Sequence, residues 1–222
     1  EVSADEYPDL HRRIERLSQQ ADLPKPTVAV ADTQVPNAFA TGRNKKNATV
    51  AVTTGLLRSL DDDELDGVLA HELSHVVNRD TLISTIAASL AGAIAFIASM
   101  ARFAALFGIG GRDQNNNIVA ILVMSIVAPI AATVIQLAIS RSREFKADRS
   151  GAELCGKPMS LANALRKLEE ASERKPMQRG NQESAHLFIV NPFSMEGLKS
   201  LFSTHPSVED RVDELKKIAR GV

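Results

Sequence analysis

The hydrophobic positions of the first 60 residues predict one helix followed by a small sheet. Within residues 5–20, Leu10, Ile14 and Leu17 recur at helical spacing among charged residues, which is typical of an amphipathic helix. Three short apolar runs that follow predict strands: Thr27–Ala31, Asn37–Thr41 and Thr49–Thr53. The segment 42–47 is polar and begins with glycine, which favours a hairpin between the last two strands.

Three further helices are predicted in the polar parts of the chain. One begins near Asp61, where Asp61 and Glu64 have the spacing of a capping box, and runs to about Asn78. The others are amphipathic and span Leu161–Ser172 and Val208–Arg220. The charged segment Glu173–Ser184 between them is expected to be a loop.

Two long apolar stretches, Leu82–Phe107 and Ile118–Ile139, interrupt this pattern. Each has about 20 residues or more, which is enough to cross a hydrocarbon core of ~30 Å. A polar, glycine-rich segment at 108–117 separates them. The stretches therefore predict a transmembrane hairpin, and the alternative is a buried helical hairpin in a soluble protein. The second stretch shows no amphipathic stripe, which favours the membrane.

Composition narrows the class of protein only slightly. The net charge is -1, which gives no indication of a nucleic-acid-binding surface. Cys155 is the single cysteine, so no intramolecular disulfide can form, and a reducing compartment fits this.

The strongest indication of chemistry is the sequence His71-Glu72-Leu73-Ser74-His75 on the predicted helix that starts at Asp61. Two histidines four residues apart lie on one helical face, where both imidazoles can bind one zinc ion. Glu72 would then be the general base that activates a zinc-bound water. The alternative is a chance match on a surface helix.

Catalytic zinc needs a third protein ligand, and the motif is not followed by a third histidine. Glu144 is the best candidate, with Asp148 one helical turn away on the same face. One carboxylate could bind the metal and the other could accept a hydrogen bond from a ligand histidine. The alternative is a solvated charged helix face. If both apolar stretches cross the membrane, Glu144 returns to the side of the histidines, and the basic residues beside that side favour a cytoplasmic site.

The chain resembles the M48 metalloproteases, and within them the HtpX-type membrane heat-shock proteases of bacteria and archaea. The matching sequences extend from about residue 10 to the end: Asn37–Gly42, Thr54–Leu57, His71–His75, Ser142–Asp148 and Thr204–Pro206. The family usually has a further membrane hairpin ahead of the first soluble helix. This sequence does not contain that hairpin, which leaves the number of spans open.

The resemblance implies roles for individual residues. His71, His75 and Glu144 would bind zinc, Glu72 would be the base, and Asp148 would orient a ligand. His205 would stabilise the oxyanion, or would be a loop histidine before Pro206. Asn37 would lie beside an edge strand that receives the substrate peptide, and Arg211 would support His205 or the last helix, or would be a surface arginine.

The sequence thus predicts a mainly α protein with a small β-sheet (α+β), built as a gluzincin-type protease core with a transmembrane hairpin. Residues 1–80 and 141–222 would form the core, and 81–140 the hairpin. The expected function is zinc-dependent cleavage of misfolded or damaged membrane proteins in the cytoplasmic membrane, with polypeptide substrates, a lipid bilayer and no nucleic acid as partners. Two alternatives are a non-catalytic zinc-binding scaffold or chaperone and a soluble metallohydrolase.

Overall fold

A computed structural model describes residues 1–106, 115–174, 188–190 and 205–221. The described elements are α1 (Pro8–Gln20), β1 (Thr27–Ala31), β2 (Ala38–Asn44), β3 (Asn47–Thr53), α2 (Thr54–Ser59), α3 (Asp62–Asn78), α4 (Asp80–Leu106), α5 (Asn115–Cys155), α6 (Pro158–Arg174) and α7 (Val208–Ala219). The predicted fold class is confirmed, because the structure is mainly helical, has one small sheet and contains two long apolar helices. The loop predicted at Glu173–Ser184 lies mostly outside the described residues.

The chain divides into two compact units. The first contains Glu1–Leu82 together with Arg141–Val222, and the second contains Ile83–Ser140. The first unit therefore consists of two segments that are distant in the sequence.

The sheet of the first unit has three strands in the order β1-β3-β2. β1 runs parallel to β3, and β2 runs antiparallel to it in a hairpin whose turn is at Lys45 and Lys46. The sequence placed this turn over six residues, whereas β2 continues to Asn44 and β3 begins at Asn47. β2 thus forms one edge of the sheet, with a row of backbone groups not paired within it.

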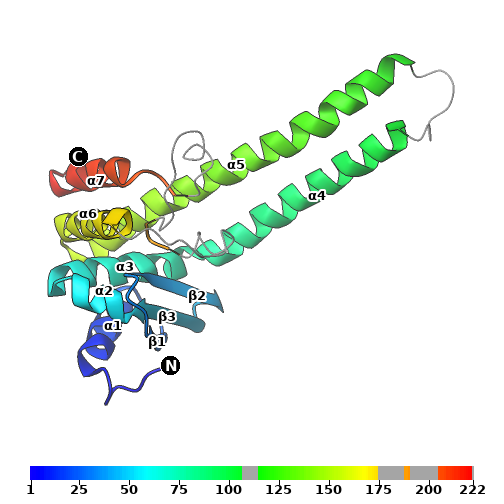
Figure 1. The fold of residues 1–222 in the computed structure, drawn as a ribbon. Helices are drawn as coiled ribbons and strands as arrows, with labels where there is room; N and C mark the ends of the chain where they lie inside the picture. Colours follow the sequence, from blue (N-terminus) through cyan, green and yellow to red (C-terminus); the bar gives the residue numbers. More distant parts are fainter. Residues whose placement is uncertain (107–114, 175–187, 191–204, 222) are drawn as a thin grey trace. The chain divides into compact units, whose positions relative to one another are not determined.

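Helix α3 is the centre of the first unit. It begins with the predicted capping box. The Asp61 side chain accepts a hydrogen bond from the backbone N–H of Glu64, and the Glu64 side chain accepts one from the backbone N–H of Asp61. Its residues from Gly67 to Ser74 are buried, because β2 and β3 lie on one side and α1 and α6 on others. α7 covers α6, which completes the layers seen in Figure 1.

Glycines allow two helices to approach α3 closely. A Cβ atom on Gly151 of α5 would come within 2.9 Å of the His71 backbone, and one on Gly67 within 2.9 Å of the Leu161 backbone in α6. Both contacts are shorter than a real side chain allows, so these positions require glycine for the observed spacing. The Gly151 contact fixes the part of α5 that carries Glu144 and Asp148 against the histidine helix.

The second unit consists of the apolar parts of α4 and α5. Over Asp80–Ala104 and Val123–Cys155 the chain is long and apolar enough to cross a membrane by length and composition. Only 6% and 11% of the most apolar windows are buried, whereas the core helix of a soluble protein would be mostly buried. Large apolar side chains such as Leu90, Phe96 and Ile130 are exposed, as expected for a surface that faces lipid.

One polar contact joins the two apolar helices. The Gln136 side chain donates to the Ala87 carbonyl at 3.3 Å. Pro129 lies inside α5, and the Thr133 hydroxyl donates to its carbonyl at 2.9 Å. Such side-chain hydrogen bonds satisfy backbone groups where water is absent.

Candidate metal centre

Helices α3 and α5 bring His71, His75 and Glu144 together in the first unit. The two Nε2 atoms are 3.1 Å apart. Glu144 places Oε2 at 3.7 Å from Nε2 of His71 and Oε1 at 3.8 Å from Nε2 of His75. Ligand atoms at ~2.1 Å from a tetrahedral zinc ion lie about 3.4 Å from one another. The three side chains therefore have the geometry of a metal-binding group.

A carboxylate lies beside the other nitrogen of each imidazole. Asp148 Oδ1 is 2.9 Å from Nδ1 of His71, and Asp80 Oδ2 is 2.6 Å from Nδ1 of His75. A carboxylate at this distance favours a proton on Nδ1 and leaves the Nε2 lone pair for a cation. Asp148 thus has the position that the sequence predicted for an orienting residue.

The charges around the imidazoles require a positive charge between them. Glu72, Asp80, Glu144 and Asp148 are buried carboxylates, and Arg211 is the buried guanidinium beside them. Burial alone would lower the pKa of His75, but the hydrogen bond to Asp80 and the charges of Glu144 and Glu72 raise it to about 9. The buried carboxylates therefore favour a positive charge between the two Nε2 atoms. A divalent cation would supply that charge and displace the proton.

Arg211 reaches the site from α7 and is 1% exposed. It donates from Nε to Asp148 Oδ2 at 2.8 Å and from a terminal nitrogen to Oδ1 at 2.7 Å, which is a bidentate pair. Burial would raise the pKa of Asp148, but Arg211 and His71 lower it to about 2. The other terminal nitrogen donates to the Ile189 carbonyl at 3.1 Å and lies 3.8 Å from Glu144. Arg211 therefore supports Asp148, and it is buried rather than a surface arginine.

Glu72 faces the sheet from the same turn of α3. Its Oε2 accepts from the backbone N–H of Ala40 in β2 at 2.9 Å. Burial raises the pKa of this carboxyl, and the neighbouring charge of Glu144 acts in the same direction. The edge strand and the proposed general base are thus in direct contact.

The remaining two predicted residues are His205 and Asn37. His205 Nδ1 is 3.2 Å from Glu144 Oε2, and His205 lowers the pKa of Glu144 against the effect of burial. Asn37 immediately precedes β2 and is buried, and its side-chain oxygen accepts from the Ile189 backbone at 3.2 Å. Asn37 therefore holds a neighbouring segment beside the edge strand.

Two contacts of the site were not predicted from the sequence, namely that of Asp80 with His75 and that of the Ala40 backbone with Glu72. Asp80 starts α4 directly after the left-handed residue Arg79, and this reversal brings it to His75 five residues earlier. An acidic residue just beyond the end of a histidine-bearing helix was the available signal. The contact of Ala40 depends on its backbone, so no side-chain pattern indicates it.

Two histidines of α3 and a glutamate of α5 form a largely buried cluster, and α3 also carries Glu72 beside the edge strand. Together with two apolar helices of membrane length, these features define a membrane metalloendopeptidase. Comparison with known proteins agrees. The profile of peptidase family M48 matches residues 4–219, and the chain belongs to this family. The predictions of family, enzyme class and general function are thereby confirmed.

Relatives from several organisms are at least 50% identical to this chain over the aligned residues. A protease HtpX homolog of Pyrococcus furiosus is 57% identical over 98% of this chain and 76% of its own length. One of Salinibacter ruber is 55% identical over 99% of this chain and 77% of its own. A third, from Methanocaldococcus jannaschii, is 50% identical over 98% of this chain and 77% of its own length.

The fold is also found in a solved structure. The crystal structure of S. mikatae Ste24p matches with a TM-score of 0.60 over 93% of this chain and 50% of that chain. The sequences are 21% identical, so this match supports the fold alone.

Proposed function

We propose that His71, His75 and Glu144 bind one zinc ion and that Glu72 is the general base of peptide hydrolysis. The observation that carries the proposal is the triangle of Nε2 and carboxylate atoms, with a carboxylate behind each imidazole. Zinc at this position would polarise the scissile carbonyl and acidify a bound water. No fourth protein ligand lies within the described cluster, which favours catalytic over structural zinc.

The protein residues then have separate tasks. Glu72 accepts a proton from the attacking water and returns it to the leaving amine, and its raised pKa suits both transfers. His205, next to Glu144, donates to the oxygen that becomes negative in the transition state. The edge of β2 binds the substrate as an additional strand, so recognition rests mainly on the peptide backbone. Asn37 fixes the start of that strand.

The cellular role follows from the membrane helices and the relatives. We propose that residues 1–80 and 141–222 form the protease core and that 81–140 is a hairpin in the cytoplasmic membrane. Arg79, Arg141 and Arg143 flank its ends on the catalytic side, which supports an active site facing the cytoplasm. Misfolded or damaged membrane proteins are the proposed substrates, since their exposed extended segments would suit a backbone-reading edge strand and a membrane location.

Metal removal and restoration tests the function. Detergent-solubilised protein should cleave casein, lose this activity after dialysis against a chelator, and recover it with stoichiometric zinc. Magnesium should not restore activity, because two imidazoles favour zinc over a hard, oxygen-preferring cation. Full cleavage by metal-free protein would contradict the proposal, and zinc binding without any cleavage would favour the scaffold.

A further inference from the structure

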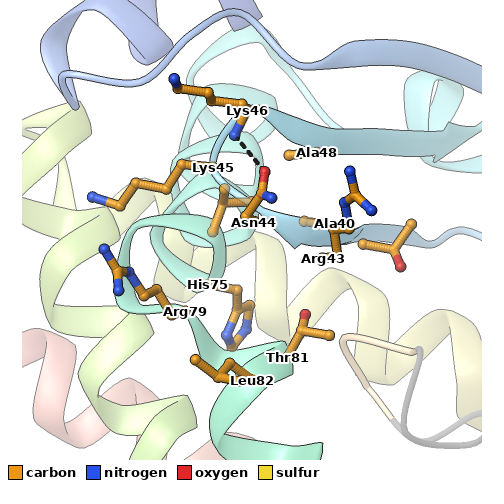
Figure 2. A pocket seen from close by; sticks show the side chains of 13 residues that line it. Ala40, Arg43, Asn44, Lys45, Lys46, Ala48, His75, Arg79, Thr81 and Leu82 are labelled. Carbon is orange, nitrogen blue, oxygen red and sulfur yellow. Dashed lines mark hydrogen bonds between the residues drawn. The ribbon is translucent and has the colours of Figure 1, made fainter.

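Beside the metal centre lies a pocket of about 450 Å³ between β2, the β2–β3 hairpin and the junction of α3 with α4. His75 forms part of its wall, so the pocket is continuous with the candidate metal centre. Figure 2 shows His75 with Arg79 on one side, Thr81 on the other and Leu82 below. The pocket belongs entirely to the first unit.

Four cations line this pocket: Arg43, Lys45, Lys46 and Arg79. It contains no acidic side chain among its lining residues. Within the described parts of the chain, none of the four forms an ion pair or a side-chain hydrogen bond, whereas most basic residues of α1 and α7 do. Arg43, Lys46 and Arg79 are exposed and Lys45 is half-buried, so the pocket has a positively charged rim with no acidic side chain among its lining residues.

Arg79, one of the four cations, has a left-handed backbone, with φ 58° and ψ 40°. This position after a helix favours glycine, and a residue with a side chain is less stable there by roughly 1 kcal/mol. A cation near the C-terminus of α3 interacts favourably with the helix dipole, which offsets part of this conformational cost. This conformation brings Asp80 to His75, and it also places the Arg79 side chain on the wall of the pocket that His75 lines.

We propose that this pocket is a subsite for an acidic side chain, Asp or Glu, of the extended peptide substrate. The inference rests on the peptidase function proposed above and specifies a preference within it. Arg43 follows Ala40, the contact of Glu72, by three residues, or ~10 Å along the strand. A peptide paired with β2 rises at the same rate, so the acidic residue lies two to four positions from the scissile bond. It lies on the side that runs toward the β2–β3 hairpin.

An anionic lipid headgroup is the competing ligand. The reason is that Thr81 and Leu82 line the pocket from the first turn of α4, which is long and apolar enough to cross a membrane. The peptide is favoured because His75 and the β2 edge both border the pocket. A lipid headgroup would not need either of them.

Quenched fluorescent peptides test the proposal. Each peptide carries one Glu, scanned from four residues before to four after the cleaved bond, and is matched by a peptide with Gln at the same position. The wild-type enzyme should prefer Glu about fivefold in kcat/KM, the effect of ~1 kcal/mol from a partly exposed ion pair. The preference should occur on one side of the bond only and should weaken in 0.5 M salt.

Variants assign the effect to the pocket. Arg79→Gln and Lys45→Gln should each lower the ratio of kcat/KM for Glu peptides over Gln peptides toward onefold, and Arg79→Glu should favour Lys peptides. Arg149→Gln, an exposed arginine elsewhere on the same unit, is the control and should keep the preference. Equal rates for Glu and Gln peptides in an active wild type would overturn the subsite.

Two other outcomes would also overturn it. In one, the variants keep the Glu preference and lose only their binding to phosphatidylglycerol vesicles, which would assign the cations to lipid. In the other, no peptide is cleaved and Glu72→Gln equals wild type, which identifies failure of the proposed function itself.

Discussion

Replacing Glu72 with Gln should abolish peptide cleavage and leave metal binding intact. Gln keeps the size of the side chain and its contact with the β2 edge, but it cannot accept the proton of the attacking water. General-base catalysis contributes about 10²–10⁴-fold, so kcat should fall by that factor. The measurement is cleavage of casein or a quenched peptide at equal bound zinc.

The control for this experiment is Glu153→Gln on α5, because Glu153 is exposed. This variant should cleave at the wild-type rate. Wild-type cleavage by Glu72→Gln would show that another group takes the proton. Loss of zinc from Glu72→Gln would show that Glu72 holds the metal instead.

Replacing Arg211 with Met should destabilise the protein by about 3–5 kcal/mol, because it leaves the Asp148 carboxylate buried without its bidentate partner. Met has a similar length and is apolar, so the loss would come from the unpaired charge. Urea denaturation in detergent at pH 7 measures the free energy of unfolding. The control is Arg149→Met, because Arg149 is an exposed arginine next to Asp148 on α5. This variant should change the free energy of unfolding by less than ~0.5 kcal/mol.

The same pair predicts a pH dependence. The pKa of Asp148 is about 2 in the folded protein, below its ordinary 3.8. A lowered carboxyl pKa contributes stability that is present above the unfolded value and is lost as the pH falls through the folded value. Wild type should therefore lose this contribution between about pH 4 and pH 2. In Arg211→Met the Asp148 pKa should rise, so acid should remove less stability in this range than it does from wild type. An unchanged profile would contradict the pair.

Much of the fold and the site could be predicted from the sequence, because both depend on local spacing. His71 and His75 share one helical face, and this relation survives any tertiary arrangement. The capping box at Asp61 and Glu64 and the length of the apolar stretches are local signals of the same kind. The prediction that Glu144 returns to the histidines needed one further argument, namely that two membrane crossings bring the chain back to its starting side.

The features that sequence reasoning missed depend on tertiary packing. α5 runs without a break from the apolar stretch through Glu144 and Asp148 to Cys155, although the composition changes from apolar to charged at Arg141. Arg211 could not be distinguished from a surface arginine, since its burial results from α7 packing over α6. Asp80 reaches His75 only because Arg79 adopts a left-handed conformation, which an arginine rarely does.

The proposed mechanism requires that side chains of α3 and α5 bind one metal ion together. Metal analysis of Glu144→Ala tests this requirement most directly. After removal of metal and reloading with one equivalent of zinc, wild type and the exposed control Glu153→Ala should each hold about one zinc ion per chain. Glu144→Ala should remain folded and should bind zinc at least about 100-fold more weakly, because one of three protein ligands is gone. Wild-type zinc affinity in a folded Glu144→Ala would contradict the central claim.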